Sequence, residues 1–446
     1  MRTDVSFHRW WFLRTLGWAL ALGVGMLLLI VQVFVVSQGR SDFCQDYIAA
    51  RWLLQGKPIY APLHCWTGYI YLPVPIELNP HPPFAILPFL PLALLPQTPA
   101  TIIWGLCSLA AYLGSGWLLL REIGWLKLQG IALFVLGSLL WHPVMLAEQL
   151  QNSGQMLLLL LVVAWLMERH GQHAWAGGSI GLAGLLRIWP LALLFPALLG
   201  RQWRQGAASG AVVVLGGAVT LLTPGSAAYG SFFGSVRANE QFWIPARGGI
   251  SLVSAIVRPF TGYGDPRFPF PPLVHALTLT QAVLLAEGIA GLLLLGGIFF
   301  LWRCQRQVRQ EPAVLLSQSL LLTLVLVCFP ITWDWGLLYL LLPGTILILA
   351  LRRLSRPPCW WYIVLSLSLV PLLEPDWFIS ILPLWLLQQT SGWRQAATLL
   401  VGMPTYGLLL FAGLQSYLLW KATRQEVLHG PGACGQNLDR EVAARV

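Results

Sequence analysis

The chain has 446 residues, of which 57% are hydrophobic and only 10% are charged. Apolar runs recur from one end to the other, which excludes a soluble protein and predicts an all-α, polytopic integral membrane protein. The net charge of +10 is explained by basic residues that stay on the cytoplasmic side during membrane insertion. It gives no indication of nucleic-acid binding.

The first apolar run covers residues 11–36 and follows Arg2, Arg9 and Arg14. It is far longer than the core of a signal peptide, and no small-residue cleavage pattern follows it, so we expect it to remain as a membrane anchor. The basic residues before it predict a cytoplasmic N-terminus, in a plasma (inner) membrane protein.

Further apolar stretches predict about 11 to 13 spans in one structural unit, residues 1–420, followed by a polar tail at 421–446. The stretch at 174–200 contains Arg187 and Pro190. Because proline removes a helix hydrogen bond and a charge in hydrocarbon is costly, we expect a break there. The stretches are 99–120, 128–147, 154–168, 174–200, 206–224, 273–301, 312–331, 335–350, 358–374, 377–390 and 395–420.

Two segments predicted on the outer side, 37–98 and 225–272, are longer than ordinary connections, and such loops usually carry function. The second holds four arginines on the side where basic residues are normally depleted, which favours an anionic ligand. They are Arg237, Arg247, Arg258 and Arg267. The sequence has no Walker-type phosphate loop, no paired-glycine nucleotide fingerprint and no HExxH zinc helix, and its cysteines lack metal-ligand spacing.

The first long loop begins with a helical pattern over residues 46–55, which predicts a short helix lying on the membrane surface with Asp42 at its approach. Residues 83–96 are apolar but too few to cross a bilayer, so we expect an interfacial or re-entrant segment. Cys44 and Cys65 lie in the same loop, where a disulfide and two free thiols are both open readings.

Five segments of the chain carry short motifs. The first loop reads DFCQDYIAARWLLQG from Asp42 to Gly56, and NPHPPFAILPFLPLALLP occupies 79–96. The third segment consists of the pair Gly154-Gln155, which opens an apolar run, and the GLAGLLR that follows it and ends at Arg187.

The last two segments are Ser251-Leu252 followed by Arg258, and FPITWDW at 329–335. Together the five segments resemble the polyprenol-phosphate-dependent mannosyltransferases of glycosyltransferase family 87, within the multi-span GT-C superfamily. The likeness covers most of residues 10–350 and implies a GT-C type helical bundle.

The chain departs from the family pattern at three places. Arg187 stands where the family usually has lysine, which keeps the charge but changes its geometry. Gly249 and Ile250 stand where asparagine and glutamine are expected. Trp335 stands where the family has histidine, so a function that needs that imidazole is not supplied there.

The resemblance implies an inverting glycosyltransferase that transfers a sugar, with mannose expected, from a polyprenyl-phosphate donor. The acceptor would be a lipid or cell-envelope glycan at the outer membrane face. An acceptor hydroxyl needs a base, and the departing phosphate needs cations. Asp42 is the expected base and Asp46 the second candidate, although helix capping also explains Asp46. The lipid-linked sugar is a co-substrate, and we expect no metal or other cofactor.

Seven further residues are candidate substrate ligands. Arg187 and Arg258 are the expected phosphate ligands. The alternative structural reading is an ion pair inside the bundle for Arg187 and an arginine at the membrane interface for Arg258. The others have structural readings too, in proline architecture, packing or the end of a span. They are Asn79, His81, Gln155, Ser251 and Asp334.

Two other readings stay open. A transporter or flippase of a lipid-linked anion would use the same arginines without a base. A catalytically silent relative would explain the departures at Trp335, Gly249 and Arg187.

Overall fold

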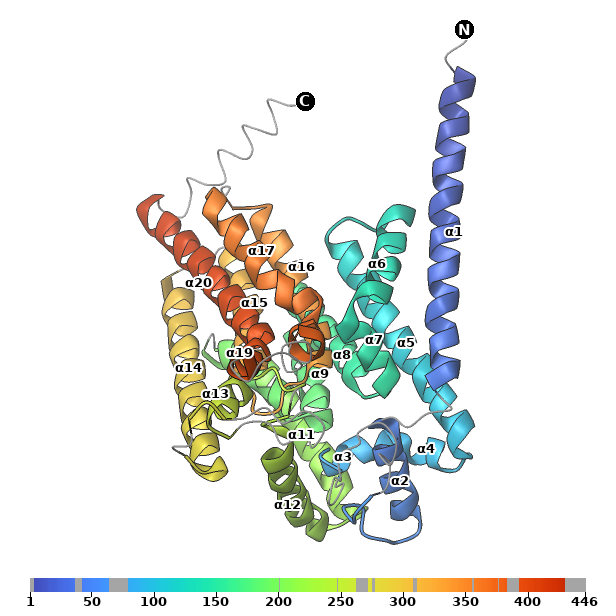
Figure 1. Ribbon diagram of the computed structural model, residues 1–446, viewed down its shortest axis with the longest axis vertical. Coiled ribbons are helices and arrows are strands. Elements are labelled where there is room, and N and C mark those ends of the chain that lie inside the picture. The colour runs from blue at the N-terminus through green and yellow to red at the C-terminus, as the bar shows by residue number, and fades with distance from the viewer. Residues whose placement is uncertain are drawn as a thin grey trace.

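The structure, a computed structural model, describes residues 4–36, 42–63, 79–199, 201–246, 248–261, 272–274, 277–307, 311–354, 357–375, 377–382 and 393–429. Within these residues every regular element is helical, and Gly249 and Trp333 form an isolated bridge of extended backbone. The prediction of an all-α protein is confirmed. Figure 1 shows a bundle of tilted helices with α1 upright at one edge.

Among the described residues, five helical segments are long and apolar enough to cross a membrane. A sixth results if α6 and α7, which are bent by 72° at Trp141, count as one span. The protein is therefore a multi-pass membrane protein, and the predicted number of about 11 to 13 spans stays a prediction. These helices are α1 (Asp4–Val36), α5 (Gln97–Glu122), α11 (Trp203–Leu222), α14 (Leu279–Gln307), η3 with α16 (Asp334–Leu340, Leu341–Leu351), and the pair α6 (Leu128–Leu140) and α7 (His142–Leu150).

Other helices fill the rest of the bundle. The predicted break at Arg187 is confirmed, because α9 ends at Leu186, Arg187 is extended, and a 3-10 helix containing Pro190 follows. The helices are α8 (Gly154–Arg169), α9 (His173–Leu186), η2 (Trp189–Leu194), α10 (Phe195–Leu199), α13 (Leu252–Thr261), α15 (Glu311–Cys328), α17 (Cys359–Leu373), η4 (Trp377–Ile381), α19 (Trp393–Leu400) and α20 (Met403–His429).

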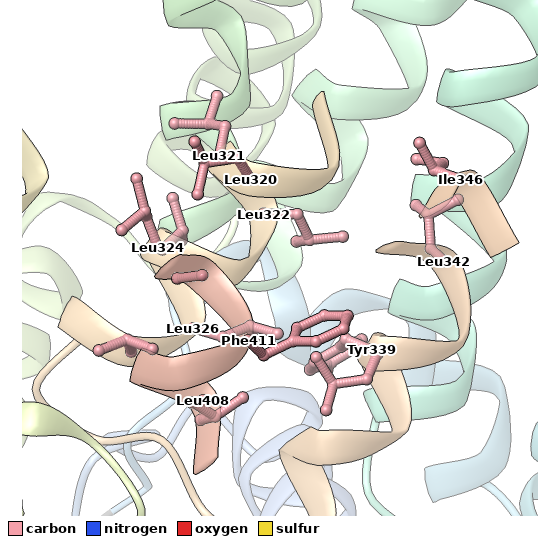
Figure 2. Close-up of a cluster of buried hydrophobic side chains, with 14 of the residues drawn as sticks. Leu320, Leu321, Leu322, Leu324, Leu326, Tyr339, Leu342, Ile346, Leu408 and Phe411 are labelled. Atoms are coloured by element: carbon pink, nitrogen blue, oxygen red, sulfur yellow. The ribbon is translucent and has the colours of Figure 1, made fainter. Parts of the chain in front are cut away.

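The main core extends from α5, α7 and α8 to the later helices of the chain. Leucines of α15, Tyr339 of η3, Leu342 and Ile346 of α16, and Phe411 of α20 pack together there (Figure 2). In lipid such helices associate through close packing rather than through exclusion of water. This core supports η3, which carries Asp334 at its first residue.

A separate layer, here called the α2 layer, lies at the end of the bundle opposite the N-terminus (Figure 1). An aromatic cluster joins it to α5: the rings of Phe43 and Tyr47 are 5.5 Å apart, and the ring of Phe89 lies 4.4 Å from that of Trp104 in α5. The layer consists of α2 (Asp42–Leu54), α3 (Pro83–Ile86), η1 (Leu87–Phe89), α4 (Leu90–Ala93) and α12 (Ser226–Trp243).

The α2 layer matches the expectations for the first long loop. The predicted helix exists, but it begins at Asp42 rather than at Asp46, with the acid in its first turn where the helix dipole favours it. Its place on the membrane surface stays a prediction. Residues 83–93 form three short helical turns that begin with Pro83 and are too short to span. Cys44 is disulfide-bonded, whereas Cys65 lies outside the described residues.

The C-terminal helix bears on the domain division. Helix α20 runs through the predicted boundary at residue 420 and ends at His429, and residues 430–446 lie outside the described part of the chain. Its C-terminal end and the N-terminal end of α1 lie at the same end of the bundle, opposite the α2 layer (Figure 1). The division at residue 420 stays a prediction.

Candidate active site

Helix α2 carries two carboxylates one turn apart. Asp42 is its first residue and Asp46 follows four positions later, so both side chains lie on one face of the helix. Phe43 and Tyr47 belong to the aromatic cluster beneath, and the Tyr47 hydroxyl donates to the carbonyl of Leu95 at 2.7 Å. Packing of one face therefore fixes the direction of both acids.

Asp46 is held in an internal network. Its Oδ1 accepts a hydrogen bond from Asn79 Nδ2 at 3.0 Å and lies 2.6 Å from Nδ1 of His81. All three side chains are at most 3% exposed. Burial, followed by the charge of Arg187, lowers the pKa of His81. In the neutral ring Nδ1–H donates to the carboxylate and Nε2 remains as an acceptor.

The carboxyl group of Asp42 lies outside the hydrogen-bond network that Asp46 forms with Asn79 and His81. The pKa of Asp42 is raised to about 7, chiefly by burial; Arg187 lowers it, Asp46 raises it, and a hydrogen bond with the side chain of Asn152 lowers it. A base whose pKa lies near the working pH is the best compromise between being deprotonated and accepting a proton strongly. The geometry therefore favours Asp42 over Asp46 as the base.

Arg187 lies at the break between α9 and η2, where its backbone is extended. Its guanidinium carbon is 5.7 Å from the centroid of the Trp335 ring. The same cation acts on both Asp42 and His81. Arg187 is thus the cation that the fold brings to the carboxylates of α2.

Asp334 and Trp335 begin η3, across from α7. Asp334 Oδ1 accepts from the backbone N–H of Trp335 at 2.9 Å, and Oδ2 lies 3.8 Å from Nε2 of His142. His142 begins α7 and was not among the predicted residues. An imidazole therefore lies close to the FPITWDW segment, although Trp335 stands at the position of the family histidine.

Arg258 and Ser251 are bound to main-chain groups. The Arg258 guanidinium is 2% exposed and donates to the carbonyls of Ala246 and Gly249, with a longer contact to Val401. The Ser251 hydroxyl donates to the carbonyl of Pro330 at 2.7 Å and accepts from the N–H of Ser254 in α13.

These bonds connect Arg258 and Ser251 to the segment that carries Asp334. Gly249 pairs with Trp333 in the β-bridge, and the N–H of Asp334 donates to Gly248. The structure joins both residues to this segment rather than to Asp42. Their predicted role in binding substrate stays a prediction.

Gln155 lies at the start of α8, as predicted, in a polar turn between α7 and α8. Glu148, Gln151 and Asn152 share this turn, and each of the four is at most 2% exposed. Asn152 Oδ1 accepts from the N–H of Gly154 at 2.8 Å, and its amide lies beside Asp42. Sequence reasoning missed Glu148, Gln151 and Asn152, although four polar residues between two apolar runs were a usable signal.

The arrangement combines a carboxylate that titrates near neutrality with one half-buried cation. This combination suits proton removal from a hydroxyl beside a departing anion. In the described part of the chain, no three side chains of the His, Cys, Asp and Glu types gather in a way that would hold a metal ion.

The fold and the site define a helical membrane protein with an acid–arginine site beside its α2 layer. The chain matches the model of glycosyltransferase family 87 over residues 79–330, more than half of its length. It therefore belongs to glycosyltransferase family 87, the family that its motifs resemble.

Two known proteins show how distant its relatives are. The chain is 29% identical over 205 residues to an alpha-(1->3)-arabinofuranosyltransferase of Corynebacterium glutamicum, a match that covers 42% of this chain and 44% of that protein. The chain thus spans less than half the length of this relative. The structure of ArnT from Cupriavidus metallidurans bound to undecaprenyl phosphate is similar with a TM-score of 0.38 and 17% identity, over 91% of this chain and 77% of that one.

Proposed function

We propose that this protein is an inverting glycosyltransferase that transfers a sugar from a polyprenyl-phosphate donor to a lipid or cell-envelope glycan. The reaction takes place at the outer face of the inner membrane, with the N-terminus in the cytoplasm. Family membership supports the reaction class. The observation that carries the proposal is the environment of Asp42, whose pKa burial raises to about 7 beside the cation of Arg187.

The proposed step is a single displacement. The acceptor hydroxyl oxygen attacks the anomeric carbon while its proton passes to Asp42. The bond between the anomeric carbon and the phosphate oxygen breaks, and its electron pair leaves with the polyprenyl phosphate. Arg187 stabilises the negative charge on that leaving group. The reaction needs no metal or other cofactor, so EDTA should leave the transfer rate unchanged.

The sugar is proposed on weaker grounds than the reaction. The motifs resemble mannosyltransferases, which supports mannose as the transferred group. The relative from Corynebacterium glutamicum is named for arabinofuranose, so this sugar belongs in every assay beside mannose.

The test compares membranes that contain the intact protein with membranes that contain Asp42→Asn. Each receives radiolabelled polyprenyl-phosphate mannose or the arabinofuranose analogue, and label in lipids and glycans is counted. We expect transfer to fall at least about a hundredfold in the variant, with donor binding retained. Equal transfer by both proteins would remove Asp42 from the mechanism.

The same variant separates the rival classes. A transporter or flippase would still move its lipid-linked anion after Asp42→Asn, since it needs no base. Donor binding without transfer to any acceptor, in the intact protein, would favour a catalytically silent relative.

A further inference from the structure

The turn between α7 and α8 holds buried polar groups that have no hydrogen-bond partner among the described residues. They are both carboxylate oxygens of Glu148 and both amide ends of Gln151 and Gln155. Glu148 and Gln155 are neighbours, but their atoms do not meet hydrogen-bond geometry. We call Glu148, Gln151, Asn152 and Gln155 the α7–α8 corner. Buried amides and carboxylates are nearly always hydrogen-bonded, so the corner needs an explanation.

The backbone holds the corner in a fixed shape. Gln151 ends α7 with a φ of 48°, a left-handed conformation that residues other than glycine seldom adopt. Trp104 Nε1 of α5 donates to its carbonyl at 2.8 Å. A Cβ at Gly105 would lie 2.7 Å from Gln151 Nε2, so the glycine gives the amide room. The side chains are therefore positioned by main-chain geometry and not by bonds to one another.

The corner adjoins the acid–arginine site. The amide of Asn152 lies beside the carboxylate of Asp42. On the other side, a Cβ at Gly154 would lie 3.2 Å from the ring of Trp335, over which Arg187 is stacked. A ligand in contact with both Asp42 and Arg187 would thus have these polar groups within reach.

The chemistry of the corner indicates which ligand it fits. The Glu148 carboxylate repels a phosphate, so the anionic part of a lipid donor belongs at Arg187 instead. A carboxylate beside two amides offers acceptors and donors together, and a sugar hydroxyl both donates and accepts. We propose that the α7–α8 corner binds the hydroxyl groups of a glycosyl ring. This proposal rests on the proposed function, and the ring comes from either the donor or the acceptor.

The test measures binding of two kinds of lipid to the full-length protein in nanodiscs. The sugar-bearing kind is polyprenyl-phosphate mannose or polyprenyl-phosphate arabinofuranose, and the bare kind is polyprenyl phosphate alone. The variants are Glu148→Gln and Gln155→Leu, which nearly keep side-chain volume. The matched control is Gln415→Leu in α20, another fully buried amide with an unpaired oxygen, whose nitrogen donates to Ser319. We expect each corner variant to lose about tenfold in affinity for the sugar-bearing lipid. Affinity for the bare lipid should not change.

If the corner binds the acceptor sugar instead, both lipids will bind normally and the KM for the acceptor will rise about tenfold in the corner variants. An equal loss of affinity for the sugar-bearing lipid and for the bare lipid would indicate that the corner only packs the fold, and it would overturn the proposal. Unchanged binding together with an unchanged acceptor KM would also overturn it. An intact protein that transfers no sugar contradicts the proposed function, but a selective loss of the sugar-bearing lipid would still support the corner.

Discussion

Arg187 is stacked over Trp335, with 5.7 Å between the guanidinium carbon and the ring centroid. The two residues occupy two of the places where this chain departs from the family pattern, the usual lysine and the usual histidine. A planar guanidinium stacks on an aromatic face more effectively than an ammonium group does. The two departures therefore meet in one contact.

The pair should act as a unit. We expect Arg187→Lys and Trp335→Leu each to lower kcat/KM about tenfold, and the double variant to lose less than the product of the two effects. A cation–π contact is worth about 0.5 to 2 kcal/mol, which sets the size of the coupling. The measurement is a double-mutant cycle on transfer rates. Strictly multiplicative losses would show that the contact contributes nothing.

The pH profile should report Asp42. Because a general base acts in its deprotonated form and the pKa of Asp42 is raised to about 7 by burial, kcat/KM should rise with pH and level off above about pH 7. Below that value the rate should fall about tenfold per pH unit. Initial rates in detergent from pH 5 to 9 measure this. A flat profile over that range would exclude Asp42 as the titrating base.

Removing the charge of Arg187 should move that profile. Arg187 lowers the pKa of Asp42, so in Arg187→Gln the rise should occur at higher pH. The residual rate must be measured at saturating donor, because the variant also binds phosphate less well. Asp46 raises the same pKa, so Asp46→Asn is the matched control and should shift the rise toward lower pH. Shifts in the same direction would contradict this arrangement.

Substitutions at Asp46 and at Asp42 should have different effects, the first on the stability of the fold and the second on the rate of sugar transfer. Asp46→Asn weakens buried bonds to Asn79 and His81, and should lower the free energy of unfolding by about 1 to 3 kcal/mol. Transfer per folded molecule should fall less than tenfold. Asp42→Asn should retain stability and lose transfer. Thermal unfolding in detergent beside the transfer assay checks both, and the reverse pattern would make Asp46 the base.

Arg258 offers a similar contrast with Arg187. Arg258→Met removes a buried guanidinium from the carbonyls of Ala246 and Gly249, and should cost about 3 kcal/mol or more. Arg187→Met should change stability by less than about 1 kcal/mol and weaken donor binding. A folded Arg258→Met protein with lost donor binding would instead support its predicted role as a phosphate ligand.

The local features of the site were predictable from sequence, because they depend on neighbouring residues. The helix at α2, the short segments after Pro83 and the break at Arg187 each follow from helix periodicity, proline or an intramembrane charge. Even there the helix began at Asp42, because an acid is favoured in the first turn.

The partnerships across the chain were not predictable. An arginine on the outer side reads the same whether it faces a phosphate or backbone carbonyls, so the burial of Arg258 had no local signature. His142 approaches Asp334 only because α7 packs against η3. The family motif included Gln155, whereas Glu148, Gln151 and Asn152 belonged to none of the five motif segments.

The aromatic cluster beneath α2 shares no buried residue with the main core. We expect the α2 layer to open as a cooperative unit at a lower free energy than the bundle, with Ala100 and Trp104 of α5 as its fixed base. Its amides should exchange with solvent together while those of α15 and α20 remain protected. An enzyme built this way can admit and release a bulky lipid by brief opening of one layer, while the bundle stays anchored in the membrane.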